Sequence, residues 1–188
     1  MPRVISGRCG GMILDAPKGL RTRPTADKVK EALFSILQSK LVDADFLDLF
    51  SGSGQIGIEA VSRGARSAYL TEADKNCWPV IRKNIEKTGF GNEITLLQGD
   101  VFRSLEVLAD KKLSFSIIYM DPPYDLAVTY LEKIVPVLLS RKLLKKGGFL
   151  IAEHRSSQKL SENVMNLTFY RCCKYGSAML TFYTTGVD

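Results

Sequence analysis

The stretch FLDLFSGSGQIGIEA, residues 46–60, decides the fold of this chain, because it joins an apolar strand to a helix through a glycine-containing bend. Gly52 and Gly54 follow the strand directly, and small residues at such a bend let backbone N–H groups approach a ligand closely. With Gly57 they match the G-x-G-x-x-G spacing of dinucleotide-binding loops. The bend therefore predicts a ligand site, and residues elsewhere must decide which ligand it holds.

Downstream of the bend, short apolar runs alternate with amphipathic stretches, as in parallel strands joined by helical crossovers. The expected strands are 46–50, 67–71, 93–98, 115–120 and 148–153, and the expected helices are 56–64, 75–88, 101–109 and 127–139. Residues 164–170 and 178–185 flank CCKYGS without a helix-length spacer, which predicts an antiparallel hairpin at the sheet edge. We expect an α/β fold with a mostly parallel sheet of seven strands.

The first forty residues differ in character from the sheet region. RVISGR and GMIL around Gly10 and Gly11 predict a small β-hairpin, and a helix is expected after Pro24. Residues 1–40 hold eight basic and three acidic residues, while the rest of the chain is nearly neutral. Arg3, Arg8 and Arg23 could lie against phosphates as a basic arm, or this charge could simply keep the N-terminus solvated.

The composition fits one globular domain of 188 residues, with 45% hydrophobic and 24% charged residues. We expect one domain, 1–188, made of an N-terminal hairpin or arm, 1–24, and a core, 25–188. No apolar run approaches the roughly 20 residues that span a bilayer, and no signal-peptide core is present, so we expect a cytoplasmic protein with no membrane partner. The four cysteines include no C-x-x-C pair, and His154 is the single histidine, so we expect no metal site.

Three acidic residues stand at or near the ends of successive expected strands. Glu72, twenty residues after Gly52, is placed to accept hydrogen bonds from a ribose diol, as in nicotinamide and S-adenosylmethionine folds alike. Asp48, in D-x-F-x-G-x-G, resembles the first motif of Rossmann-like methyltransferases. Asp100 and Val101, in QGDVF, stand where those families contact the adenine, although Asp100 could instead be a helix N-cap.

The segment MDPPYD, 120–125, follows the fourth expected strand at the end where α/β proteins place their sites. Two prolines fix the backbone and remove two N–H donors, so nearby carbonyls can point into a pocket. An exocyclic amine of a base is a poor nucleophile, and its N–H groups could donate to the Asp121 carboxylate and the Pro122 carbonyl. Pro123 makes this corner rigid, and Tyr124 could stack on the base. The alternative is that the segment is only a turn that ends a strand.

RVISGRCGGMIL, RPTADKVKEALFSIL and DLFSGSGQIGIEAVSRGA together resemble the bacterial RsmD family, over nearly the whole chain. This family methylates the N2 amine of a guanine in small-subunit (16S) ribosomal RNA. The resemblance implies a Rossmann-like class I methyltransferase that uses S-adenosylmethionine. It also implies a ribosomal RNA partner, which could be part of a small-subunit assembly particle.

The resemblance assigns residues as well. Cofactor contacts would come from Gly52, Gly54, Glu72 and Asp100, and the segment 121–124 would be catalytic. Arg23 and Thr25 match the N-terminal motif, which would lie over the cofactor or the RNA. The spacing GLRTRPT has an extra Arg-Thr before RPT, which leaves the place of Arg21 open.

Three other functions remain open at this point. The first is a DNA adenine or cytosine amino-methyltransferase, although the chain has no room for an added DNA-recognition domain. The second is a nicotinamide-dependent oxidoreductase that uses the same glycine bend. The third is an RNA-binding module without activity, against which the intact DPPY segment argues.

Overall fold

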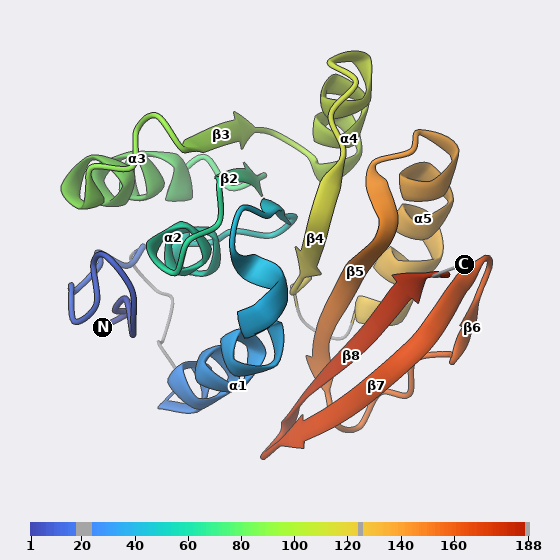
Figure 1. Cartoon of the computed structure of the whole chain (residues 1–188). Helices are drawn as coiled ribbons and strands as arrows, with labels where there is room; N and C mark the ends of the chain where they lie inside the picture. The colour runs from blue at the N-terminus through green and yellow to red at the C-terminus, as the bar shows by residue number, and fades with distance from the viewer. Residues whose placement is uncertain (18–23, 124–125, 187–188) are drawn as a thin grey trace.

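The chain forms one twisted sheet with helices on both faces (Figure 1). The computed structural model describes residues 1–17, 24–123 and 126–186, and of residues 24–26 only the backbone. The helices are α1 (Pro24–Leu41), α2 (Gln55–Ser62), α3 (Cys77–Thr88), α4 (Val101–Asp110) and α5 (Ala127–Ser140). The strands are β1 (Asp45–Asp48), β2 (Ser67–Glu72), β3 (Ile94–Gln98), β4 (Phe115–Met120), β5 (Leu144–Arg155), β6 (Asn163–Val164), β7 (Leu167–Tyr175) and β8 (Ala178–Thr185).

The sheet order is β3-β2-β1-β4-β5-β8-β7-β6. β1 to β5 pair in parallel, and β8, β7 and β6 complete the sheet in antiparallel pairing. The chain runs from β1 outward to β2 and β3, then returns past β1 to β4. The strand order therefore reverses between β1 and β4, the place where α/β proteins bind ligands.

Two cores cover the two faces of the sheet, because successive residues of a strand point to opposite sides. Phe46 and Ile117 pack with apolar residues of α1, α2 and α3. Leu47 and Ile118, the next residues along the same strands, pack with α4 and α5. The parallel strands are thus buried on both sides, which explains why they read as continuous apolar runs in the sequence.

The expected α/β class, parallel strands and C-terminal hairpin are confirmed, with differences in detail. The sheet has eight strands, since Met165 adopts a φ of 52° in a turn that separates β6 from β7. Cys172 and Cys173 lie within β7, and the hairpin turn is at Gly176, so CCKYGS is mostly strand. β5 begins at Leu144, four residues early, because a register irregularity in its pairing with β4 accommodates the extra residues.

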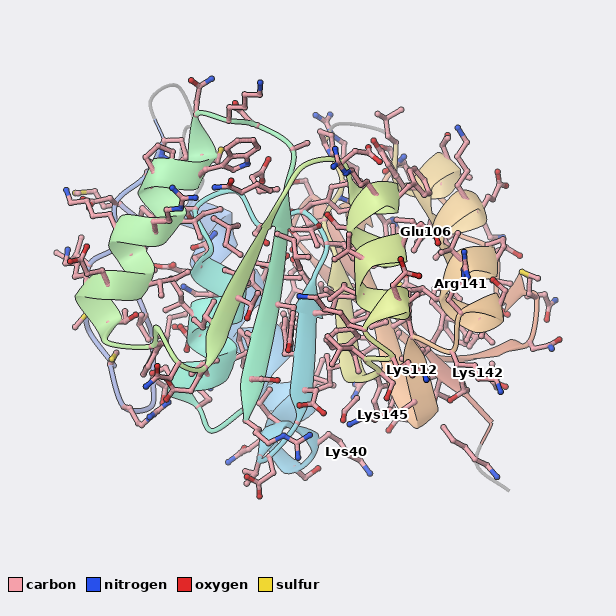
Figure 2. All side chains as sticks on the ribbon, turned by 90° about the horizontal axis from the view of Figure 1, so that it is seen from above. Lys40, Glu106, Lys112, Arg141, Lys142 and Lys145 are labelled. Carbon is pink, nitrogen blue, oxygen red and sulfur yellow. The ribbon has the colours of Figure 1, made fainter. Side chains whose placement is uncertain are left out.

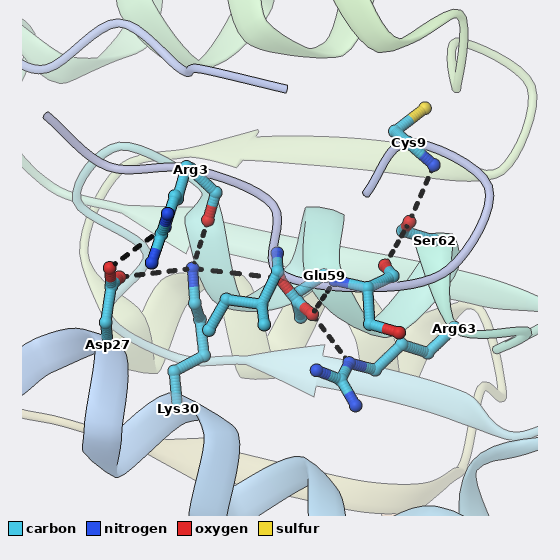
Figure 3. A network of polar contacts seen from close by, with 9 residues as sticks. Arg3, Cys9, Asp27, Lys30, Glu59, Ser62 and Arg63 are labelled. Atoms are coloured by element: carbon cyan, nitrogen blue, oxygen red, sulfur yellow. Dashed lines mark hydrogen bonds and ion pairs between the residues drawn. The ribbon is translucent and has the colours of Figure 1, made fainter. Parts of the chain in front are cut away.

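The N-terminal hairpin is present and is docked against α2. Arg3 and Ile13 form an isolated antiparallel bridge, and the Val4 amide donates to the Met12 carbonyl at 2.8 Å. At Gly7 a side chain would meet the Ser62 carbonyl oxygen at 1.9 Å, so only glycine permits this close approach. The Cys9 amide donates to Ser62 Oγ at 3.0 Å (Figure 3).

Among the described residues, no helix has both the length and the apolar character that crossing a membrane requires.

Candidate active site

The glycine bend lies at the carboxyl ends of three adjacent strands, β2, β1 and β4. The Ser51 amide donates to the Thr71 carbonyl of β2 at 3.0 Å. On the other side, the Leu49 amide donates to the Tyr119 carbonyl of β4 at 3.0 Å. The bend is therefore held at the point where the strand order reverses. Residues 121–123, which we call the DPP corner, directly follow β4 and lie beside the bend.

Glycine serves two different purposes in the bend. Gly52 has a φ of 55°, which most side chains disfavour, and a Cβ built there would meet nothing within 4 Å. The backbone of Gly52 therefore faces open space. At Gly57 a side chain would come within 2.1 Å of Leu70 Cδ2, so this glycine lets α2 pack closely against β2. The literal G-x-G-x-x-G match thus combines a position that faces open space with a packing position.

Asp48 is buried beneath the bend with an incomplete set of hydrogen bonds. Asp48 is only 1% exposed, and its Oδ1 accepts a hydrogen bond from the Phe50 amide at 3.4 Å. Among the described residues no hydrogen-bond partner reaches Oδ2. Burial, with a smaller contribution from the charge of Glu72, raises the pKa of Asp48 to about 7. An acidic oxygen without a partner fits a ligand that brings positive charge or N–H donors to this place.

Glu72 ties the end of β2 to the bend. Its Oε2 accepts from the Gly52 amide at 2.7 Å, and its Oε1 accepts from the Asp74 amide at 2.8 Å. The side chain is half-buried, and each carboxylate oxygen has further lone pairs that can accept hydrogen bonds. The structure thus brings Glu72 and the glycine bend together, as the sequence predicts. A ribose contact stays a prediction.

Asp100 acts as the N-cap of α4. Its side chain accepts from the Phe102 amide at 2.8 Å, which is the alternative interpretation that the sequence left open. The Asp100 residue is exposed and Val101 is buried. Both follow β3, which is separated from β1 by β2. Their predicted contacts with an adenine remain untested.

The DPP corner begins where β4 ends, with Asp121 and Pro123 exposed and Pro122 buried. Tyr124 lies outside the described residues. Behind the corner, the buried Tyr119 hydroxyl donates to the Glu153 carboxylate of β5. Burial and the negative charges of Glu153 and Asp121 raise the pKa of Tyr119 well above its usual value, so this phenol stays protonated.

Two polar groups that support the site were missed by sequence reasoning. One is the Tyr119 and Glu153 pair. The other is Asn84, fully buried in α3, whose Nδ2 donates to the Ser53 carbonyl at 2.9 Å and to the Asp15 carbonyl at 3.0 Å. Asn84 therefore fastens the end of the N-terminal hairpin to the glycine bend. No sequence pattern marked it, since one asparagine in an amphipathic helix is ordinary.

The predicted RNA contacts are spread over the molecule. Arg3 Nε lies 3.2 Å from Asp27 Oδ2, and Arg8 Nη2 lies 2.9 Å from Glu93 Oε1. Glu93 directly precedes β3, so Arg8 lies toward the amino end of the strands and away from the bend.

The other residues of the predicted arm are only partly described. Arg21 and Arg23 lie outside the described residues. Thr25 is in the first turn of α1, and its side chain is not described.

His154 and the cysteines are of residue types that can bind metal ions. In the described part of the chain, no three His, Cys, Asp or Glu side chains gather as they would around a metal ion. His154 is buried in β5, where Nε2 lies 2.8 Å from Thr181 Oγ1, and burial lowers its pKa.

This sheet order, with a glycine bend after β1 and an antiparallel C-terminal hairpin, defines a Rossmann-like methyltransferase fold. A putative methyltransferase from Escherichia coli, yhhF, has a TM-score of 0.83 and 26% sequence identity, covering 99% of this chain and 98% of that one. An RNA methyltransferase from Salinibacter ruber, solved with S-adenosyl-L-homocysteine, has a TM-score of 0.65 at 17% identity, covering 90% and 95%. The second likeness concerns the fold alone.

The family follows from the sequence comparisons. Residues 2–184 match the family described as conserved hypothetical protein 95. The chain is 33% identical to the putative rRNA methyltransferase YlbH of Bacillus subtilis, covering 96% of this chain and 97% of the relative. It is 31% identical to ribosomal RNA small subunit methyltransferase D of Escherichia coli K12, covering 90% and 82%. The chain therefore belongs to the conserved hypothetical protein 95 family, the RsmD family, and the resemblance stated from its motifs is confirmed.

Proposed function

We propose that the protein methylates the exocyclic N2 amine of a guanine in small-subunit ribosomal RNA, with S-adenosylmethionine as the methyl donor. One observation carries this proposal: the glycine bend and the DPP corner are fastened together by the hydrogen bond from the Leu49 amide to the Tyr119 carbonyl, at 3.0 Å. A donor seated on the bend and a base held at the corner would then be neighbours. The names of the relatives, which act on ribosomal RNA of the small subunit, support the choice of substrate.

The residues around the bend fit this cofactor. The buried Oδ2 of Asp48 lacks a hydrogen-bond partner among the described residues and suits the positively charged amino group of a methionine moiety. Glu72 suits the ribose hydroxyls, and the open space beside Gly52 leaves room for the cofactor to approach the protein backbone. Asp100 and Val101 would lie near the adenine. S-adenosylmethionine would supply a methyl group bonded to a positively charged sulfur.

The DPP corner would activate the base. Asp121 and the Pro122 carbonyl would accept the two N–H groups of the amine, which returns electron density to the nitrogen and aims its lone pair at the methyl carbon. The amine loses one proton after the transfer, to Asp121 or to water. Because Tyr119 and Pro122 are buried, this acceptor cluster needs little rearrangement when a base arrives.

The partner and the place of action follow from this function. Arg3, Arg8, Arg23 and Thr25 are candidates for contacts with RNA, and an assembling small subunit could supply the specificity that a short chain lacks. Such an enzyme would act in the cytoplasm, where ribosomes assemble. A flipped or single-stranded guanine is the expected target, because unpaired bases enter an active site at the lowest cost.

The test is tritiated S-adenosylmethionine labelling of small-subunit ribosomal RNA from a strain that lacks the protein, followed by identification of the labelled nucleoside. Labelled N2-methylguanine is expected. Asp121→Ala should reduce transfer by about a hundred- to a thousandfold while S-adenosylhomocysteine affinity stays within a few fold, by analogy with losses of about 10²–10³ on removal of one such group. Glu132→Gln, which changes an exposed carboxylate of α5, is the control. Labelling of duplex DNA but not of RNA would contradict the proposal.

A further inference from the structure

Basic residues gather at the amino ends of the central parallel strands, and the candidate active site lies at the opposite, carboxyl ends. β1, β4 and β5 lie side by side, and their amino ends and the turns before them comprise residues 40–45, 110–114 and 141–148. These segments hold seven basic residues and three acidic ones. Figure 2 shows Lys40, Lys112, Lys142 and Lys145 along one side of the molecule. We call these three segments the lysine edge.

Contacts within the protein neutralise only part of this charge. Asp45 accepts from Arg66 and from Lys145, whose Nζ lies 2.6 Å from Asp45 Oδ2. Arg141 pairs with Glu106. Lys40, Lys112 and Lys142 are exposed and take part in none of the ion pairs that the described residues form.

Helix ends explain the basic residues at the lysine edge only in part. Lys111 and Arg141 are the C-caps of α4 and α5, where the helix dipole stabilises a cation. Lys112 and Lys142 each come one residue later, with φ values of 55° and 54°. Glycine or asparagine suits that backbone conformation better than lysine does, so local conformation does not account for the choice of lysine at either place.

The lysine edge also contains a hollow of about 190 Å³, lined by residues that include Lys40, Lys145 and Lys146. Gly148, one of its lining residues, is closely packed: a side chain there would lie 2.8 Å from the Lys145 carbonyl oxygen and 3.0 Å from both the Ser116 carbonyl oxygen and Leu144 Cδ1. At about 30 Å³ per water molecule, the hollow has room for one phosphate group. Lys40, which forms no ion pair among the described residues, and Lys145, which pairs with Asp45, place positive charge around this hollow and favour a polyanion.

We propose that the lysine edge binds the phosphate backbone of the RNA substrate, at a segment other than the one that carries the target base. This inference rests on the proposed function. The six residues of β4 separate the two ends of the parallel strands by roughly 20 Å, so the few nucleotides around the target base do not reach the lysine edge. A long or folded RNA, which can contact both places at once, is therefore the preferred substrate.

The experiment compares two double variants with the same change of charge. Lys112→Gln/Lys142→Gln alters the lysine edge, and Arg82→Gln/Lys133→Gln alters exposed positions of α3 and α5. Binding of purified small-subunit ribosomal RNA is measured over a salt series. The first variant should flatten the slope of log K against log salt by about 1.5 and raise Kd roughly tenfold at 0.1 M salt. The second variant should stay within about twofold of wild type.

The outcomes separate this inference from the proposed function. An unchanged slope for Lys112→Gln/Lys142→Gln on ribosomal RNA would overturn the inference, even if the wild type methylates that RNA. So would unchanged RNA binding combined with a loss of binding to vesicles of anionic lipid, which would assign the surface to a membrane. If the variant loses affinity for ribosomal RNA as expected but the wild type labels no RNA, the lysine edge stands and the proposed function fails.

Discussion

Asp48 and Glu59 are both buried carboxylates close to the glycine bend, and the protein satisfies them very differently. Glu59 in α2 accepts from the Ile5 amide at 2.6 Å, from the Ser6 amide at 3.1 Å and from Arg63 Nε at 2.6 Å. The Lys30 ammonium lies 3.7 Å away. Figure 3 shows this network around Glu59. The contacts of Asp48 with Phe50, Gly57 and Ser51 are weaker, and among the described residues one of its oxygens lacks a hydrogen bond of normal geometry.

The difference separates a carboxylate that the protein satisfies by itself from one that is a candidate for ligand binding. A buried charge is tolerated when hydrogen bonds and opposite charges surround it, and Glu59 meets that condition by joining the N-terminal hairpin to α1 and α2. Asp48 does not meet it, which raises its pKa to about 7. A polar group left so poorly satisfied costs stability, and a ligand that supplies the missing partner would recover that cost on binding.

The largest effect is expected for Glu59→Ala. The change leaves the buried Lys30 ammonium with Asp27 at 4.0 Å and the Arg3 carbonyl, and it removes the acceptor of two backbone amides. The free energy of unfolding should fall by about 3–5 kcal/mol, measured by urea denaturation. Glu59→Ala/Lys30→Met should recover part of the loss, because the double variant no longer contains the buried Lys30 ammonium that Glu59 would have paired with. A loss below about 1 kcal/mol for the single variant would show that the network is not structural.

Asp48→Asn, in contrast, should weaken cofactor binding without lowering the free energy of unfolding. Asparagine keeps the size of the side chain and removes the charge, so the free energy of unfolding at neutral pH should not fall. Affinity for S-adenosylhomocysteine, measured by calorimetry, should fall about 10–100-fold, since hydrogen bonds to charged groups contribute about 1.5–3 kcal/mol. The control is Asp110→Asn, an exposed residue at the end of α4. Unchanged affinity would remove Asp48 from the cofactor site.

The raised pKa of Asp48 predicts a pH dependence with a definite sign. Since the folded-state pKa is about 7 and the ordinary value is 3.8, the folded protein without ligand favours the protonated acid. The resulting stability is fully present below pH 3.8 and is lost as the pH rises through about 7. Relative to Asp48→Asn, the wild type should therefore lose stability over this range.

The affinity for S-adenosylhomocysteine should rise with pH, whereas the stability of the protein without ligand falls. S-adenosylhomocysteine should bind several-fold more tightly at about pH 8 than at about pH 5.5, because the carboxylate is then ready to meet the ammonium group. Calorimetry at the two pH values measures the effect. Asp48→Asn, which cannot titrate here, should give a flat profile, and equal slopes for both proteins would contradict the assignment.

The smallest effect is expected for Arg8→Ala. Arg8 pairs with Glu93 and lies over the Phe90 ring at 4.5 Å, but its side chain is 55% exposed. Exposed ion pairs contribute about 0–1 kcal/mol, so urea denaturation should show a loss within that range. The affinity for S-adenosylhomocysteine should not change, because Arg8 lies toward the amino end of the strands. A tenfold loss of that affinity would place the hairpin closer to the cofactor than its contacts suggest.

Local signals in the sequence predicted most of the sheet. β4 and the ends of β2 and β3 were placed within one residue, since apolar runs bounded by turns depend on burial alone. The early start of β5 and the break before β7 were missed. A register irregularity and a positive φ at Met165 arise from pairing with neighbouring strands, which no local pattern reports.

The candidate site was predictable where its residues follow one another along the chain. Gly52, Gly54 and the segment from Asp121 to Pro123 were identified because the bend and the corner are continuous in sequence. Tyr119, Glu153 and Asn84 were not identified, because their role comes from partners 31 to 69 residues away.

The sequence by itself determined the family, the order of strands and helices, and the two segments that form the candidate site, because each is written in short stretches whose chemistry is local. Only the tertiary structure decided that Glu59 is satisfied while Asp48 is not, and that lysines from three separate turns share one edge. Both facts depend on which groups the folded chain brings within a few ångströms of each other. Hydrogen bonds and charge interactions are determined by those distances, not by the separation of residues along the chain.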